Sequence, residues 1–104
     1  MKVKLKNGTT VDCSNPIEQK IFKGGVDAGW ICSLSLTSRL SSNEIDELVT
    51  ADNMSEMTFL NDDGEAVVTL SGYSKLTSAV IRHSDVNGSV DIQLTKPTLP
   101  IAEN

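Results

Sequence analysis

Three turn dipeptides, each between runs of alternating apolar and polar residues, constrain the fold of this chain more than any other feature. They are Asn7-Gly8, Asp63-Gly64 and Asn87-Gly88. Such pairs favour the positive-φ turns whose twist matches that of two paired strands, so each one predicts a β-hairpin. A chain of 104 residues that contains three hairpins is expected to fold as one β-rich domain.

The pattern of facing residues selects the register of the first hairpin. A three-residue loop over Lys6–Gly8 sets Val3 opposite Val11 and Lys2 opposite Asp12. A two-residue loop would instead set Val3 opposite Asp12 and mix the two faces. We therefore predict a bulged hairpin with its glycine in the left-handed conformation.

The second hairpin is predicted to turn tightly at Asp63-Gly64, with two residues in the loop. This register makes both faces of the strand pair apolar or threonine, which is typical of strands covered on both sides. The predicted pairs are Phe59 with Val68, Met57 with Leu70, and Leu60 with Val67.

The third hairpin is predicted to turn through a four-residue loop over Asp85–Gly88. The predicted pairs are Ile81 with Ile92, Ala79 with Leu94, and Arg82 with Asp91. His83, the one histidine of the chain, would then lie on the apolar side of its strand with Val90 or Ile92 opposite.

A strand and a helix are predicted between the first two hairpins. The strand covers Trp30–Leu36. Its inward side carries Trp30, Cys32, Leu34 and Leu36. Ser41 and Glu44 have the spacing of a capping box, and Ile45, Leu48 and Val49 follow at helical spacing. They predict a helix of about ten residues that packs on the sheet.

A weaker helical signal begins at Asn15-Pro16, because proline favours the first turn of a helix. It predicts one helical turn. The side chains of Ile17, Ile21 and Phe22 would face inward, and Gly24-Gly25 would end the turn in a loop.

Together these elements predict an α+β fold. We expect a mostly antiparallel, hairpin-connected sheet of about six strands with one helix packed on it, and the twist of three hairpins favours closure into a small barrel or sandwich. The domain is expected over residues 1–96. Pro97 and Pro100 lack the backbone donor that a central strand needs, so residues 97–104 are predicted to form an extended C-terminal arm.

Candidate chemistry is sparse in this sequence. Cys13 and Cys32 lie in apolar, strand-like contexts and are expected to be buried free thiols. His83 has no nucleophile and orienting group at motif spacing, and one histidine with two distant cysteines makes a poor zinc site. The stretch Asp85–Asp91 lacks the acids of an EF-hand loop. We therefore predict no catalytic, metal or cofactor site, and a protein that is not an enzyme.

Charge is distributed unevenly along the chain, whose net charge is −5. Residues 40–74 carry eight carboxylates and no lysine or arginine, whereas residues 1–39 carry a net charge of +3. The eight carboxylates are Glu44, Asp46, Glu47, Asp52, Glu56, Asp62, Asp63 and Glu65. Such asymmetry is typical of a protein with a face for a partner, although solvated turns and a helix surface would give the same pattern.

The arm offers a second candidate surface, because Leu99 and Ile101 are apolar in a segment that has no core of its own. A frayed terminus is the alternative. These two residues and the eight carboxylates are the candidate interaction residues.

We expect a protein partner. An acidic chain is a poor ligand for the phosphate backbone of nucleic acid, and no apolar run reaches the roughly 18–20 residues of a membrane span. The alternating N-terminus lacks the apolar stretch of a secretory signal, which predicts a cytoplasmic location.

Two functional hypotheses follow from the charges. The acids could contact Lys2, Lys4 and Lys6 of a further copy, which gives a salt-sensitive homo-oligomer. Alternatively, a monomeric inhibitor or decoy could use them to occupy a basic groove on a host protein.

Several stretches resemble small β-rich proteins encoded by phages and prophages of Gram-positive bacteria. They are Gly72–Leu76, Val80–Ile81, Asp91–Lys96, Glu44–Leu48 and Asp63–Glu65. The resemblance covers about the last two-thirds of the chain and implies a virion or tail-associated component, or a small accessory protein, in a bacterial host. It implies no functional residue at any position of this sequence.

Overall fold

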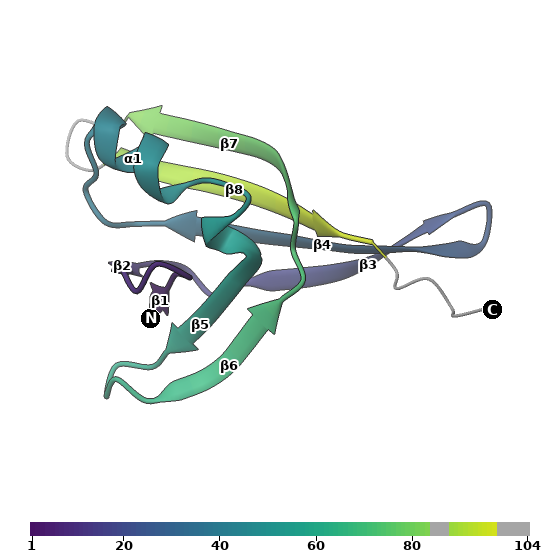
Figure 1. Cartoon of the computed structure of the whole chain (residues 1–104), viewed down its shortest axis with the longest axis horizontal. Helices are drawn as coiled ribbons and strands as arrows, with labels where there is room; N and C mark the ends of the chain where they lie inside the picture. Colours follow the sequence, from purple (N-terminus) through teal and green to yellow (C-terminus); the bar gives the residue numbers. More distant parts are fainter. Residues whose placement is uncertain (84–87, 98–104) are drawn as a thin grey trace.

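The computed structural model describes residues 1–83 and 88–97, with the backbone alone at 81–83 and 88, and contains two antiparallel sheets of four strands each (Figure 1). The first sheet consists of Lys2–Lys4 (β1), Thr10–Asp12 (β2), Glu56–Leu60 (β5) and Ala66–Ser71 (β6), in the order β2-β1-β5-β6. The second consists of Ile17–Lys23 (β3), Val26–Leu36 (β4), Lys75–His83 (β7) and Gly88–Lys96 (β8), in the order β3-β4-β8-β7. The helix Ser42–Leu48 (α1) and the 3-10 turn Asn53–Ser55 (η1) connect β4 to β5.

The β-rich α+β class with antiparallel hairpins and one packed helix is confirmed. The described strands are divided between two sheets and form no closed barrel, where one sheet of about six had been expected. The core takes side chains from both sheets and from α1, including the fully buried Val3, Phe59, Leu36 and Leu94. An isolated bridge between Cys13 and Leu36 joins the end of β2 to the end of β4.

The predicted register of the first hairpin is confirmed. Val3 pairs with Val11 and Lys2 pairs with Asp12. Gly8 has φ +92°, and its N–H donates to the carbonyl of Leu5 at 2.9 Å. A one-residue slip would expose the buried Val3, so the pattern of facing residues selects this register.

The second hairpin differs from its prediction at the turn. Phe59 pairs with Val68 as expected, but a bulge follows and Leu60 pairs with Ala66, not Val67. The cause is Asn61, whose side-chain oxygen accepts hydrogen bonds from the N–H groups of Asp63 (3.0 Å) and Glu65 (2.9 Å). The backbone N–H of Asn61 donates to the carbonyl of Glu65, so the turn holds three residues. The expectation that both faces are covered is also wrong, because Val67 and Val68 on β6 are 53% and 40% exposed.

The predicted register of the third hairpin is wrong by two positions. Ala79 pairs with Ile92, Ile81 with Val90, Arg82 with Ser89, and His83 with Gly88. β8 begins at Gly88, which had been expected to be the last residue of the loop, and residues 84–87 lie outside the described residues. Each side chain keeps its face under a two-residue shift, so the apolar pattern could not distinguish the two registers.

The helical turn predicted after Asn15-Pro16 is wrong, because β3 occupies this stretch and pairs with β4. Ile17 and Phe22 do not face inward and are 59% and 61% exposed. Gly24-Gly25 is the turn of the β3–β4 hairpin, with φ values of +58° and +80°. A Gly-Gly pair between strands is typical of a hairpin turn. Here it indicates the structure correctly, whereas the helix predicted from Pro16 does not form.

The strand and helix predicted in the middle of the chain are confirmed. β4 contains the predicted Trp30–Leu36 and begins earlier, at Val26. Both hydrogen bonds of the capping box are present between Ser41 and Glu44. The helix covers seven residues, fewer than expected, because the side-chain amide of Asn53 donates to the carbonyl of Leu48 at 2.9 Å and ends it.

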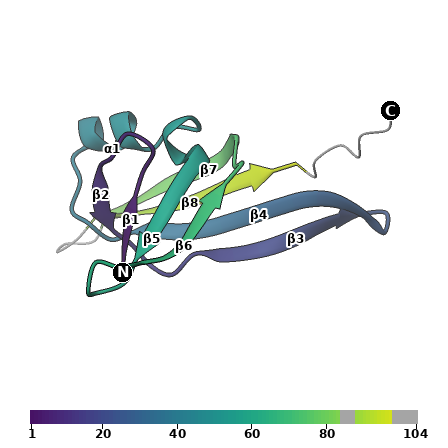
Figure 2. The ribbon, with the colours of Figure 1, turned by 60° about the horizontal axis from the view of Figure 1, so that its bottom comes forward.

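The β3–β4 hairpin gives the molecule its shape. It extends beyond the two sheets, and its tip lies at the opposite end of the molecule from α1 in both ribbon views (Figures 1 and 2). Two regions therefore differ in packing: a body with a core, and a projecting hairpin.

Candidate functional site

The three acids of α1 lie at one end of the molecule. Glu44 accepts from the backbone N–H of Ser41 and is part of the helix cap. Asp46 and Glu47 are exposed on the helix surface. The structure records no hydrogen bond or ion pair of these two side chains with other described residues, so a partner could bind them without breaking one.

The next two acids lie close to the N-terminal lysines. Asp52 forms an ion pair with Lys6 at 3.2 Å. Glu56 begins β5 and lines a hollow of about 420 Å³ together with Lys4 and Lys6. Lys2 forms an ion pair with Asp12 at 3.5 Å. The three N-terminal lysines, which were expected to contact the acids of another copy, thus lie beside acids of the same chain.

The remaining three acids lie at the turn between β5 and β6. Asp62 is 3.5 Å from the N-terminal ammonium group, but its side chain is 98% exposed, so solvent screens the pair strongly. Asp63 and Glu65 are exposed on the same turn. This turn and α1 lie on different sides of the molecule in both ribbon views (Figures 1 and 2), so the acids form separate groups along the fold.

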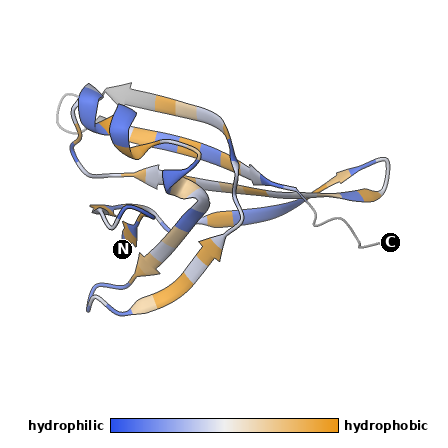
Figure 3. Cartoon of the chain, viewed as in Figure 1, coloured by the Kyte–Doolittle hydropathy of each residue, from blue (hydrophilic) through white to orange (hydrophobic). Residues whose placement is uncertain are grey.

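The projecting hairpin is a surface that the sequence analysis missed. Phe22 and Val26 are 61% and 68% exposed on the two strands beside the Gly24-Gly25 turn, where Figure 3 shows apolar segments outside the body. Val26 pairs with Lys23 and therefore shares its face, while Phe22 points to the other face. The tip is apolar on both sides.

A cluster of polar contacts stiffens the same hairpin. Lys20 forms an ion pair with Asp27 at 2.8 Å and lies 5.5 Å from the centre of the Trp30 ring. Asp27 also accepts from the backbone N–H of Gly29 at 2.9 Å. Gly29 has φ +119°, and a Cβ at this position would lie 2.2 Å from the carbonyl oxygen of Lys96. The hairpin leaves the body at this close contact.

Tyr73 connects the two sheets. It lies between β6 and β7, is fully buried, and donates its hydroxyl proton to Glu18 Oε2 on β3 at 2.6 Å. Lys96 lies 4.9 Å from the centre of its ring. Burial raises the pKa of Tyr73 far above its ordinary value, and the hydrogen bond to Glu18 and the charge of that carboxylate act in the same direction.

The two cysteines are buried free thiols, as predicted. Burial is the main cause that raises the pKa of Cys13 and of Cys32 to about 11. Because the thiolate is the nucleophilic form, both side chains are poor nucleophiles at neutral pH in the folded state.

The other candidates for chemistry are spread through the fold. The backbone of His83 pairs with Gly88, not with Val90 or Ile92, and its side chain is outside the described set. Within residues 1–83 and 88–97, no three His, Cys, Asp or Glu side chains form a group that could hold a metal ion. Leu99 and Ile101 lie outside the described residues. No helix in the described ranges has the length and apolar character needed to cross a bilayer.

The candidate surfaces are therefore the acidic groups and the apolar hairpin tip. Comparison with protein-family models, with curated proteins and with solved structures finds no match.

Proposed function

We propose that this protein is a non-enzymatic structural module that assembles with further copies of itself. The observation that carries the proposal is the projecting β3–β4 hairpin, which exposes Phe22 and Val26 beside its turn. Exposed apolar side chains that gather at the end of a projecting element are typical of a surface that another protein covers.

Charge complementarity supports a second copy as the partner. Lys23 lies beside the hairpin turn and forms no ion pair with an acid of the described residues. The exposed carboxylates of Asp46 and Glu47 lie on α1 at the opposite end of the molecule (Figures 1 and 2). A contact between the hairpin of one copy and α1 of the next brings these charges together. Because the two surfaces differ, the contact repeats into a ring or an open polymer.

Light scattering coupled to size-exclusion chromatography tests the proposal, over a range of protein concentrations at low and high salt. We expect an oligomer that dissociates as salt rises, because exposed ion pairs are screened. Replacing Phe22 and Val26 by Ser should lower the mass at every concentration. The matched control is Val67→Ser, which changes a valine on β6 that is 53% exposed and should leave the mass unchanged. A wild-type chain that stays monomeric under all conditions would overturn the proposal.

The alternative function is an acidic inhibitor or decoy that occupies a basic groove on a host protein. It needs the acids of α1 and of the β5–β6 turn on one face, and their separation in the ribbon views favours assembly instead (Figures 1 and 2). If the chain is monomeric, capture of a basic protein from a host lysate, lost when Asp46 and Glu47 are changed to Lys, would support this alternative.

The biological setting that we propose is a phage or prophage particle or its tail, on the basis of the sequence resemblance alone. Mass spectrometry of purified particles from a bacterium that carries the gene tests this setting. We expect the chain in stoichiometric amounts with the other particle proteins. Its absence from particles would point to an accessory protein of the host cytoplasm.

A further inference from the structure

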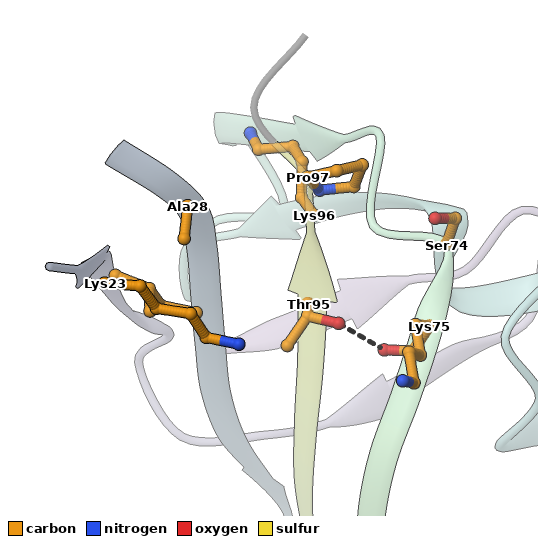
Figure 4. Close-up of a pocket in the computed structure, with 8 residues that line it drawn as sticks. Lys23, Ala28, Ser74, Lys75, Thr95, Lys96 and Pro97 are labelled. Carbon is orange, nitrogen blue, oxygen red and sulfur yellow. Dashed lines mark hydrogen bonds between the residues drawn. The ribbon is translucent and has the colours of Figure 1, made fainter. Parts of the chain in front are cut away.

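A pocket lies on the second sheet where the β3–β4 hairpin leaves the body. It has a volume of about 350 Å³, within the range of small-molecule sites. Ile21, Ala28 and Pro97 form its apolar wall, and Ser74, Thr95 and three lysines complete the lining. Figure 4 shows these side chains around the end of β8.

Two of the lysines give the pocket its charge. Lys23 extends from the hairpin toward Thr95, and Lys75 lies on the other side of Thr95, on β7 (Figure 4). The third lysine, Lys96, extends its ammonium over the ring of Tyr73, so it contributes mainly its backbone and stem. Two cations therefore flank one hydroxyl group.

The charge of these two lysines is not balanced within the described part of the chain. No carboxylate lines the pocket, and no ion pair joins Lys23 or Lys75 to an acid among the described residues. The nearest hairpin acids bond elsewhere: Asp27 to Lys20, and Glu18 to Tyr73. A protein with a net charge of −5 thus keeps a concave site with positive charge, which attracts small anions.

The neutral groups of the pocket also fit an anion with an organic part. The hydroxyl of Thr95 makes only a long contact of 3.5 Å to the carbonyl of Lys75, so it can turn to donate to a ligand. The aliphatic wall can cover an apolar group next to the charged head. We propose that this pocket binds a small organic anion with a doubly charged head group, of the class of phosphate monoesters.

Titration of dilute protein, at a concentration where scattering shows a monomer, tests this site separately from assembly. The probe is phenyl phosphate, followed by backbone amide NMR shifts. We expect saturable shifts at Ser74, Lys75 and Thr95. Inorganic phosphate should bind the same residues more weakly, because it lacks the apolar part, and phenol should not bind.

Single replacements of Lys23 and of Lys75 by Gln should each weaken phenyl phosphate binding about tenfold, as expected for loss of one charge-assisted hydrogen bond. Lys2→Gln removes the same charge from a distant exposed site on β1 and is the matched control, for which we expect no change. Amide spectra of the three variants report whether each remains folded.

Four results would overturn the proposal, three of which come from the titrations. They are shifts that do not saturate, equal weakening by Lys2→Gln, and binding of phenol as tight as that of phenyl phosphate. A fourth is tighter binding of a peptide with the sequence of residues 41–49, since the pocket would then be a docking site for the acidic helix of a second copy. The proposed assembly could survive any of these results, because its test measures mass and not ligand binding.

Discussion

The inner and outer halves of the β3–β4 hairpin share two strands and one hydrogen-bond ladder, yet only the inner half has a core against it. On β4, Cys32 and Leu36 are fully buried, whereas Val26 is 68% exposed. Yet every second residue of β4 from Val26 to Leu36 is apolar, in the outer half as in the inner half. The comparison teaches that alternation specifies a strand, while burial depends on which other elements lie against it.

Gly29 marks the boundary between the two halves. Its pairing with Ile21 is followed directly by the bulge of the β3–β4 ladder, and its missing side chain leaves room for the carbonyl oxygen of Lys96. Beyond this residue the hairpin has no neighbour in β8, because β4 pairs with β8 only from Trp30 onward. The body and the hairpin should therefore respond differently to equal substitutions.

The largest difference is expected from two phenylalanines. Phe59→Ala should lower the free energy of unfolding by about 3–5 kcal/mol, since Phe59 is fully buried and its loss leaves a cavity. Phe22→Ala should change it by less than about 0.5 kcal/mol, because the side chain is 61% exposed. Urea unfolding followed by the fluorescence of Trp30 measures both. Similar losses would mean that the hairpin tip is packed against something in solution.

The boundary itself should be the next most sensitive position. Gly29→Ala places a Cβ against a backbone oxygen at φ +119° and should destabilise the fold by at least about 2 kcal/mol. Gly25→Ala at the hairpin turn has φ +80° and open space around the added atom, so only the left-handed backbone costs energy, about 1 kcal/mol. Thermal unfolding of both variants compares them. Equal losses would show that the contact with Lys96 is not tight.

A smaller loss is expected where the inner half of the hairpin is held to the body. Tyr73→Phe removes the hydrogen bond to Glu18 and should lower the free energy of unfolding by about 1–2 kcal/mol. Glu18→Gln keeps an acceptor at the same position and should lose less. A larger loss in Glu18→Gln than in Tyr73→Phe would contradict this account of the bond.

Tyr73 also predicts a pH dependence. The folded state raises the pKa of this phenol, so it holds the proton more tightly than the unfolded chain does. The stability contributed by the group is complete below the unfolded pKa of about 10 and falls as pH rises above that value. Because the chain has one tyrosine, phenolate absorbance at 295 nm should appear only together with loss of the β-sheet circular dichroism signal. Phenolate formation at pH 10 in a folded protein would contradict the buried hydrogen bond.

The smallest expected effect lies at the helix. Ser41→Ala removes the side-chain acceptor of the N-cap and should lower the free energy of unfolding by about 1 kcal/mol. Ser42→Ala, one residue inside the helix and exposed, is the matched control and should change it by less than about 0.5 kcal/mol. Equal effects would show that the capping box does not stabilise α1 in solution.

Local signals predicted most of the body. The register of the first hairpin followed from the positions of Val3 and Val11, and the start of α1 from the spacing of Ser41 and Glu44. Each of these features is decided within a few residues of sequence. Two registers were mispredicted. The Asn61 side chain widened the turn of the second hairpin, and in the third hairpin a two-residue shift of β7 on β8 left every side chain on the same face.

The hairpin and the lysine pocket were harder to predict. Ile17 and Phe22 are apolar, so a core position was expected. Phe22 is exposed because it lies where the chain has left the body, and Ile17 is exposed because it pairs with Ser33 and so lies on the face of the sheet opposite the buried Cys32. Lys23 and Lys75 come together because β8 lies between β4 and β7 in the sheet. A pocket lined by residues so far apart in sequence depends on the strand order, which no turn dipeptide encodes. The acids of residues 40–74 lie within one stretch of the sequence, yet the fold distributes them over α1, the residue before η1, β5 and a turn.

The length of β4 has a consequence for dynamics. A strand of eleven residues that is buried at one end and exposed at the other should show a gradient of amide hydrogen exchange, slow at Leu36 and fast near Val26, because local opening needs less free energy where fewer side chains pack. Whatever covers the hairpin tip would slow exchange at its outer amides first. β4 would thus act as a built-in reporter of occupancy, in which the number of protected amides measures how far along the hairpin a partner reaches.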